Sequence, residues 1–346
     1  MRKLIIIVLL IILSTPSVLA LEYEAPPAPE SVEKYVPPDN QTFGEGLWYI
    51  TKQAIALLSP SLADAGELCL RLFVIVLFVS VLKDYTGISK YAVSLVATVC
   101  ISLVLVQATN TMVHLGTETI TQISDYGKLL LPVMTGALAA QGGISTSAAL
   151  YTATALFNSV LSSFIAKILV PMLYIYMIFC IGFRAMDEEL LKNIRNFLKW
   201  LITWSIKISI YLFTGYLSIT GVISGTTDAS ALKAAKLAVS GAIPVVGNII
   251  SDASETILVS AGVLKNAAGI YGLFVILSLW IGPFVKIGVQ YLILKATSAL
   301  CSGFGAKESC GLIQDFSGIM GLIVAMTATV CILFFVSIVC CLKGVG

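Results

Sequence analysis

This sequence has little charge for its length. Only 12% of its 346 residues are Asp, Glu, Lys or Arg, whereas 58% are hydrophobic. An ordinary soluble domain is roughly 25% charged, because a water-soluble fold needs polar side chains on its surface. The shortage argues against a soluble enzyme or binding module, and we expect lipid to cover much of this chain.

The residues that carry most enzyme chemistry are also scarce. The sequence has one histidine, His114, and its eight cysteines show no C-x-x-C spacing of the kind that holds zinc. It contains no G-x-x-x-x-G-K-[ST] phosphate loop, and its net charge of +2 comes without a basic stripe. We therefore expect no enzyme activity, no cofactor, no metal site and no nucleic-acid partner.

The N-terminal part predicts export. Residues 1–20 have a charged start, a short apolar core and small residues at a cleavage position, typical of a signal peptide; an uncleaved anchor is the alternative. Residues 21–46 are rich in proline and predict a mobile extracytoplasmic linker. Residues 47–66 predict an amphipathic interfacial helix, because Trp48 and Tyr49 suit a membrane surface.

Residues 67–346 predict an all-α, polytopic membrane helix bundle. Apolar runs of about the length that crosses a bilayer recur through this part. The expected spans are 68–82, 91–108, 168–183, 201–223, 269–299 and 319–342. Between them we expect a polar loop over 305–318, and Pro/Gly-broken segments within 129–166 and 241–268 that are either re-entrant or interfacial.

An internal tandem repeat is predicted. Two prolines 39 residues apart recur with the same separation, namely Pro132 with Pro171 and Pro244 with Pro283. The apolar and polar stretches around them also correspond at this offset, which predicts repeats over 91–183 and 203–295. The expected topology makes the two repeats parallel.

The paired breaks indicate where a transport path would lie. Proline and glycine in an apolar segment free backbone groups that lipid cannot satisfy, and paired interruptions in two halves point to a binding or conduction site. Lys286 follows the Pro283 bend and either lines a polar cavity or snorkels. Asp252 either faces that path or caps a helix. The candidate path or hinge residues are Pro132, Gly136, Gly142, Gly143, Pro244, Gly247, Asp252, Glu255, Pro283 and Lys286.

Charge asymmetry sets an expected orientation. If residue 21 is outside, eight basic residues lie in cytoplasmic segments, namely Lys83, Lys90, Arg184, Lys192, Arg195, Lys199, Lys295 and Lys307. Five lie in outside segments beyond the first span, namely Lys128, Lys233, Lys236, Lys265 and Lys343. This modest excess agrees with the positive-inside rule.

Several blocks of this sequence resemble one family. Residues 131–143, with Leu131-Pro132 and Gly142-Gly143, resemble a block of the stage III sporulation protein AE family of endospore-forming bacteria. Residues 235–269 resemble its most distinctive block, and Pro283-x-x-Lys286 follows as in that family. The resemblance runs from about residue 66 to the end, while the segment 21–66 is shorter than the family pattern.

The resemblance implies a role that composition and spacing do not show. Members of that family are made in the mother cell and lie in the membrane that surrounds the engulfed forespore. They act with the other stage III A proteins, including a separate ATPase, and indirectly with the forespore's stage II protein Q. Together these form a channel-like or secretion-like complex needed for forespore development, in which this subunit is the membrane core, conduit or gate.

Two other functions fit parts of the sequence. A secondary transporter of a small solute would also use a repeat with paired breaks, but we find no acidic residue deep in a span for ion coupling. A non-conducting membrane scaffold would tolerate substitution of Pro132, Pro244 and Lys286.

Overall fold

The described chain is helical. The computed structural model describes residues 25–38, 42–85, 89–140, 144–219, 267–304 and 307–343. The helices are η1 (Glu33–Tyr35), α2 (Phe43–Tyr85), α3 (Lys90–Ala140), α4 (Ile144–Phe164), the π-helix η2 (Ile165–Leu169), α5 (Val170–Met186), α6 (Glu189–Ile219), α9 (Ala267–Ser302) and α10 (Lys307–Lys343). Within these ranges there is no strand, and the predicted all-α membrane bundle is confirmed.

Five of the helical segments in the described ranges are long and apolar enough to cross a membrane. They are Phe43–Leu82, Tyr91–Thr135, Tyr151–Met186, Gly269–Ser302 and Lys307–Cys340. The expected span over 201–223 is not among them, because Lys207 and several hydroxyl side chains dilute the apolar part of α6. Residues 220–223 lie outside the described ranges.

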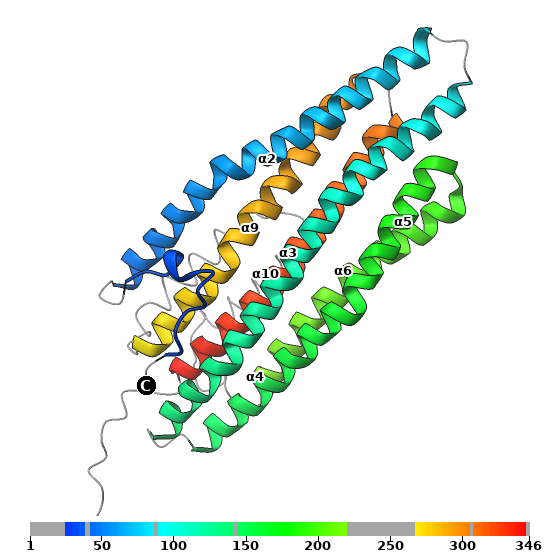
Figure 1. Cartoon of the computed structure of the whole chain (residues 1–346). Helices are drawn as coiled ribbons and strands as arrows, with labels where there is room; N and C mark the ends of the chain where they lie inside the picture. Colours follow the sequence, from blue (N-terminus) through cyan, green and yellow to red (C-terminus); the bar gives the residue numbers. More distant parts are fainter. Residues whose placement is uncertain are drawn as a thin grey trace, which may run out of the picture.

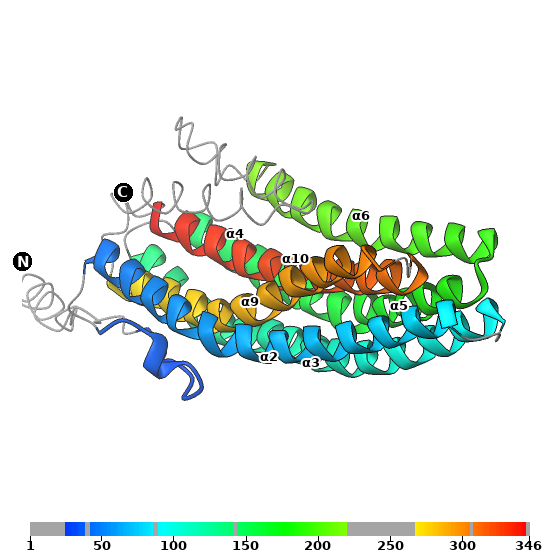
Figure 2. The ribbon, with the colours of Figure 1, turned by 90° about the horizontal axis from the view of Figure 1, so that it is seen from above.

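The helices run side by side along one elongated bundle (Figure 1). The ends of α2, α5 and α9 and the starts of α3, α6 and α10 gather at one end, which we call the hairpin end (Figures 1 and 2). This grouping agrees with the expected topology, in which these three connections share one side. That this side is the cytoplasm stays a prediction.

The helices are longer than the predicted spans. α3 has 51 residues, which at ~1.5 Å per residue is about 76 Å, more than twice the ~30 Å hydrocarbon core. α2 has 43 residues and joins the expected interfacial helix 47–66 to the following span without interruption. The polar stretch expected as a loop over 305–318 is instead helical from Lys307, at the start of α10.

The break expected at Pro132 and Gly136 is not seen, whereas around Pro283 one long span with a bend was expected. α3 continues across Pro132 and Gly136, and α9 continues across Pro283. A proline removes one backbone hydrogen bond and bends a helix, but a helix packed in a bundle keeps its other bonds. Residues 129–140 therefore extend the span that precedes them, rather than forming a separate broken segment.

α10 lies at the centre of the bundle. Of its most apolar window, 72% is buried, a larger share than in any of the other four candidate spans. Ser298 and Ser317 donate hydrogen bonds across the antiparallel α9–α10 pair, to the carbonyls of Cys310 at 2.9 Å and Tyr291 at 3.1 Å. Against α3, the ring of Phe334 fills the space that a Cβ at Gly127 would take. The centre of the described bundle is thus filled by protein.

α2 and α9 form a parallel pair on one side of the bundle (Figures 1 and 2). Near their starts the rings of Phe43 and Phe274 stack at 5.5 Å. Further along, the Thr297 hydroxyl donates to the Cys69 sulfur at 2.9 Å. These contacts keep one register along the pair and hold both helices against the core.

Residues 25–38, expected as part of a mobile linker, lie against the bundle. The Tyr126 hydroxyl donates to the carbonyl of Pro26 at 3.1 Å, and the amide of Ala28 donates to the Tyr271 hydroxyl at 3.3 Å. The Ser278 hydroxyl donates to the carbonyl of Tyr35 at 3.0 Å. We call residues 25–38 the strap, because they join α3 to α9.

Two expectations are not tested by this fold. The signal peptide over 1–20 lies outside the described residues. The repeat is not confirmed, because much of its second half, 220–266, also lies outside them.

Candidate functional site

The structure does not assemble the candidate path predicted from sequence. Pro132 and Gly136 lie in α3, and Pro283 and Lys286 lie in α9. Lys286 is exposed and makes no ion pair or hydrogen bond within the described residues. The other six candidates lie outside the described ranges, namely Gly142, Gly143, Pro244, Gly247, Asp252 and Glu255.

A different group of charged side chains meets at the hairpin end. The group begins with the turn between α5 and α6. Asp187 follows α5 in the left-handed conformation, with φ of 52°, and its amide donates to the carbonyl of Phe183 at 2.8 Å. Asp is one of the few residues besides glycine that adopts this conformation readily. The turn reverses the chain and brings Arg184 of α5 and Arg195 of α6 to the same side of the bundle.

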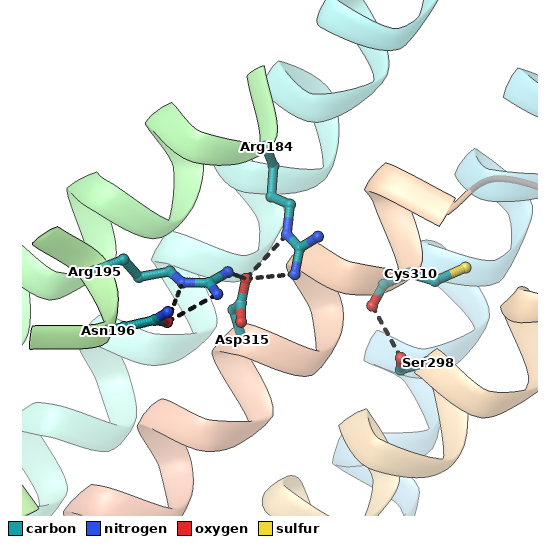
Figure 3. Close-up of polar contacts among 6 residues, drawn as sticks. All are labelled: Arg184, Arg195, Asn196, Ser298, Cys310 and Asp315. Carbon is teal, nitrogen blue, oxygen red and sulfur yellow. Dashed lines mark hydrogen bonds and ion pairs between the residues drawn. The ribbon is translucent and has the colours of Figure 1, made fainter. Parts of the chain in front are cut away.

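Both arginines converge on one carboxylate of α10 (Figure 3). Asp315 Oδ2 accepts hydrogen bonds from Arg184 Nε and from Arg195 Nη1, at 3.0 Å each, and forms an ion pair with Arg184 Nη2 at 3.0 Å. The remaining Arg195 nitrogens, Nε and Nη2, donate to Asn196 Oδ1 at 3.3 and 3.0 Å. We call Arg184, Arg195 and Asp315 the charged triad; it joins three helices through one oxygen atom.

Packing around the charged triad keeps it mostly from water. The side chains of Arg184, Arg195 and Asp315 are 22%, 14% and 14% exposed. The Phe183 ring lies under both guanidiniums, with its centroid 5.0 Å from the Cζ of Arg184 and 4.6 Å from that of Arg195. A Cβ at Gly311 would overlap the Arg184 guanidinium. Gly311 therefore provides the space in which that guanidinium sits.

The charge of the triad is not balanced. Two guanidiniums, which stay protonated at any ordinary pH, share one carboxylate and leave one net positive charge. Burial strengthens the attraction between the ions and also raises the cost of breaking it. The arrangement suits a lock between helices.

Aromatic side chains of α6 lie next to the charged triad. The rings of Phe197, Trp200 and Trp204 stack at 6.0 Å intervals along the helix. They are 56%, 56% and 47% exposed, although aromatic side chains of this size are usually buried. Exposed tryptophan is typical of the boundary between lipid tails and headgroups, which fits a position of the charged triad near one membrane surface.

Sequence reasoning found only part of the charged triad. Arg184 and Arg195 were expected among the cytoplasmic basic residues, whereas Asp315 fell in a predicted loop. Its partners lie 131 and 120 residues away in the chain. The available signal was a helical spacing: Gly311 and Asp315 are four residues apart and so share one face of α10.

Comparisons with known proteins show which family the chain belongs to. The model of the family described as "Stage III sporulation protein AE (spore_III_AE)" matches residues 39–344. The chain belongs to this family. It is also 24% identical over 279 residues to "Stage III sporulation protein AE" of Bacillus subtilis (strain 168), which covers 79% of this chain and 70% of that protein. No solved structure matches.

Membership in the stage III sporulation protein AE family confirms the resemblance and gives this protein a role in sporulation, as one of the stage III A set. The five apolar helices fit a multi-pass membrane protein. Among the residues that the structure describes, no three His, Cys, Asp or Glu side chains are grouped to hold a metal ion. The chemistry that the described site offers is charge pairing between helices.

Proposed function

We propose that this protein is the integral-membrane subunit of a channel-like complex between mother cell and forespore. The supporting observation is an all-helical bundle, in a sporulation family, whose three hairpin connections gather at one end. In this proposal the protein lies in the mother-cell membrane around the forespore, with its signal peptide removed. It is not an enzyme and has no energy source of its own, since its sequence contains no phosphate loop.

The charged triad gives the subunit a rigid contact face in this proposal. It ties the α5–α6 hairpin to α10, and α10 is tied to α9 through Ser298 and Ser317. The hairpin end then moves as one body. If that end is cytoplasmic, as the charge asymmetry predicts, it faces the separate ATPase, whereas the strap faces the forespore side and stage II protein Q.

Timed removal of the protein tests the proposal. A degradation tag would remove the chain from sporulating cells after engulfment, and a late forespore reporter gene would be followed. We expect reporter expression to stop, because the complex is needed continuously. Continued expression after complete removal would overturn the proposal. A tagged chain that is not degraded serves as the control.

Two measurements separate the alternative functions. The purified chain in liposomes should show no solute uptake without its partners; uptake by the chain alone would favour a secondary transporter. If the protein is a non-conducting scaffold, every variant that co-isolates with the other stage III A proteins should also support expression of the forespore reporter. We expect instead that some variants co-isolate with these proteins but do not support reporter expression.

A further inference from the structure

The outward face of α3 is polar over 22 of its 51 residues, from Gln107 to Lys128. Exposed side chains recur at intervals of three or four residues along this face, so they form one stripe on the helix. The stripe consists of Gln107, Asn110, His114, Glu118, Thr121, Asp125 and Lys128. These residues cover about 32 Å at ~1.5 Å per residue, close to the thickness of a bilayer core.

The neighbouring α4–α5 segment exposes mainly apolar side chains at the same height, together with Ser159, Ser163 and Lys167. Tyr174 donates to Asn110 Oδ1 at 2.6 Å, which fixes the register of α3 against the α4–α5 segment. In that register Leu156, Val160 and Ile168 lie level with the stripe, and they are 62%, 65% and 47% exposed. Lipid suits these three side chains, but it cannot satisfy the amides and charges beside them.

One end of the stripe opens into a groove. The groove, of about 480 Å³, lies between α3 and α5. Gln107, Asn110 and Tyr174 supply polar atoms to it, and Leu103, Val106 and Ile181 supply apolar walls. The Asn110 amide nitrogen and the whole Gln107 amide form no hydrogen bond within the described part of the chain. The groove therefore offers donors and acceptors to water or to another chain.

We propose that the stripe lines a water-filled path enclosed between copies of this chain, with α3 of each copy facing the path and the apolar faces beside it facing lipid or the next copy. The inference rests on the proposed channel function and deepens it. A path through a single copy is not available in the described centre, where Phe316, Ile319 and Phe334 of α10 are at most 1% exposed. A single helix face cannot enclose water, so further copies are needed to close the path.

The charges of the stripe indicate what such a path accepts. Lys128 is paired with Asp125 at 2.8 Å, so these two side chains cancel. Glu118 accepts from Gln122 Nε2 at 3.2 Å and has no cationic partner in the described residues. Among the carboxylates and the lysine of the stripe, each copy therefore leaves one negative charge facing the path. Cations and neutral polar solutes are therefore favoured over anions.

Thiol labelling of the full chain in sporulating cells tests the path. The starting variant has no native cysteines and still supports sporulation. Single cysteines replace stripe residues in one set (Asn110→Cys, His114→Cys, Thr121→Cys). Two further sets replace apolar residues at the same height on the α4–α5 segment (Leu156→Cys, Val160→Cys) and buried residues of α3 (Val113→Cys, Ile120→Cys). Cationic and anionic membrane-impermeant reagents are compared. We expect the stripe cysteines to react at least ~10-fold faster than both other sets, because only they meet water.

The charge preference of the path and the contact between copies of the chain are measured in the same cells. Thr121→Cys should react a few-fold faster with the cationic reagent, and Glu118→Gln should abolish that preference without changing the reaction with a neutral reagent. A bifunctional thiol reagent long enough to cross the path should link two copies at Thr121→Cys, because a direct disulfide would need Cα atoms within about 7 Å of each other.

Three results would overturn the inference. Slow labelling of the stripe, as at Leu156→Cys, would mean that lipid or another protein covers it. Equally fast labelling of stripe and flank would mean that this half of the bundle stands in open water. If no stripe position gave cross-linked copies, a second copy of the chain would not enclose the path. If the labelling pattern holds but blocking His114→Cys leaves the forespore reporter unchanged, the path exists and the proposed conduit role fails.

Discussion

The guanidinium of Arg184 occupies the space beside Gly311, one helical turn before its carboxylate partner Asp315. The glycine and the aspartate share one face of α10, so the first provides room and the second provides charge. This relationship explains why the polar, glycine-containing start of α10 lies inside the bundle: the Arg184 side chain of the α5–α6 hairpin packs against it.

Gly311→Ala should therefore destabilise the protein, although alanine is intrinsically the better helix former. The new methyl group displaces Arg184 from Asp315, and we expect a loss of about 1–3 kcal/mol, comparable to other overpacked sites. Gly215→Ala in α6 is the matched control, since no atom of the described residues lies within 4 Å of a Cβ added there; it should be neutral or stabilising by up to ~1 kcal/mol. Thermal unfolding of both variants in detergent gives the comparison, and equal melting temperatures would contradict the steric explanation.

Asp315→Asn should be more harmful than the loss of any exposed ion pair. It leaves two mostly buried guanidiniums without an anion, and breaking a buried pair costs about 3–5 kcal/mol, somewhat less at this partial exposure. Glu189→Gln removes the partner of Lys192, a pair whose side chains are 76% and 41% exposed, and should cost at most ~1 kcal/mol. The two changes are compared by thermal unfolding. If Asp315→Asn melts no lower than Glu189→Gln, the charged triad is not a lock.

The helical class of this chain follows from its sequence, but the site does not. Apolar runs place the helices because lipid and protein cores both require them. The limits of several helices differ from the prediction, and the expected span over 201–223 is not among the candidate spans. Pro132 suggested a break because an isolated helix would bend or end there, but packing against neighbouring helices keeps α3 continuous. Around Pro283 the sequence predicted one long span, and α9 is one long helix. Asp315 was missed because its partners come from another hairpin, and the spacing of Gly311 and Asp315 does not identify a partner 131 residues away.

Asn158→Leu should stabilise the protein. Asn158 is 2% exposed, and among the residues that the structure describes neither its amide nitrogen nor its amide oxygen has a hydrogen-bond partner. A buried polar group without a partner costs about 1–3 kcal/mol, and leucine has a similar volume. The melting temperature in detergent should rise by a few degrees. A fall would show that the amide has a partner in the assembled protein and would make Asn158 a functional candidate.

Removing two tyrosine hydroxyls should release the strap. Tyr126→Phe and Tyr271→Phe together delete the hydrogen bonds to Pro26 and Ala28, each worth about 1 kcal/mol. Hydrogen–deuterium exchange should then increase within 25–38 and stay unchanged in α10. Tyr211→Phe, at a side chain that is 50% exposed, is the control and should leave exchange in the strap unchanged. Unchanged exchange in the double variant would show that other contacts hold the strap.

The orientation of the hairpin end is the central claim, and one accessibility experiment tests it directly. Single cysteines at Ser89, Glu188 and Gly303 mark the three connections, and one at Glu30 marks the strap at the other end of the bundle. Membrane vesicles are prepared with the extracytoplasmic face of the membrane outward. A membrane-impermeant thiol reagent is then added to the outside of these vesicles. We predict labelling of Glu30→Cys alone, with the other three reacting only after the membrane is permeabilised. Labelling of any one of those three from the same side as Glu30→Cys would contradict the account.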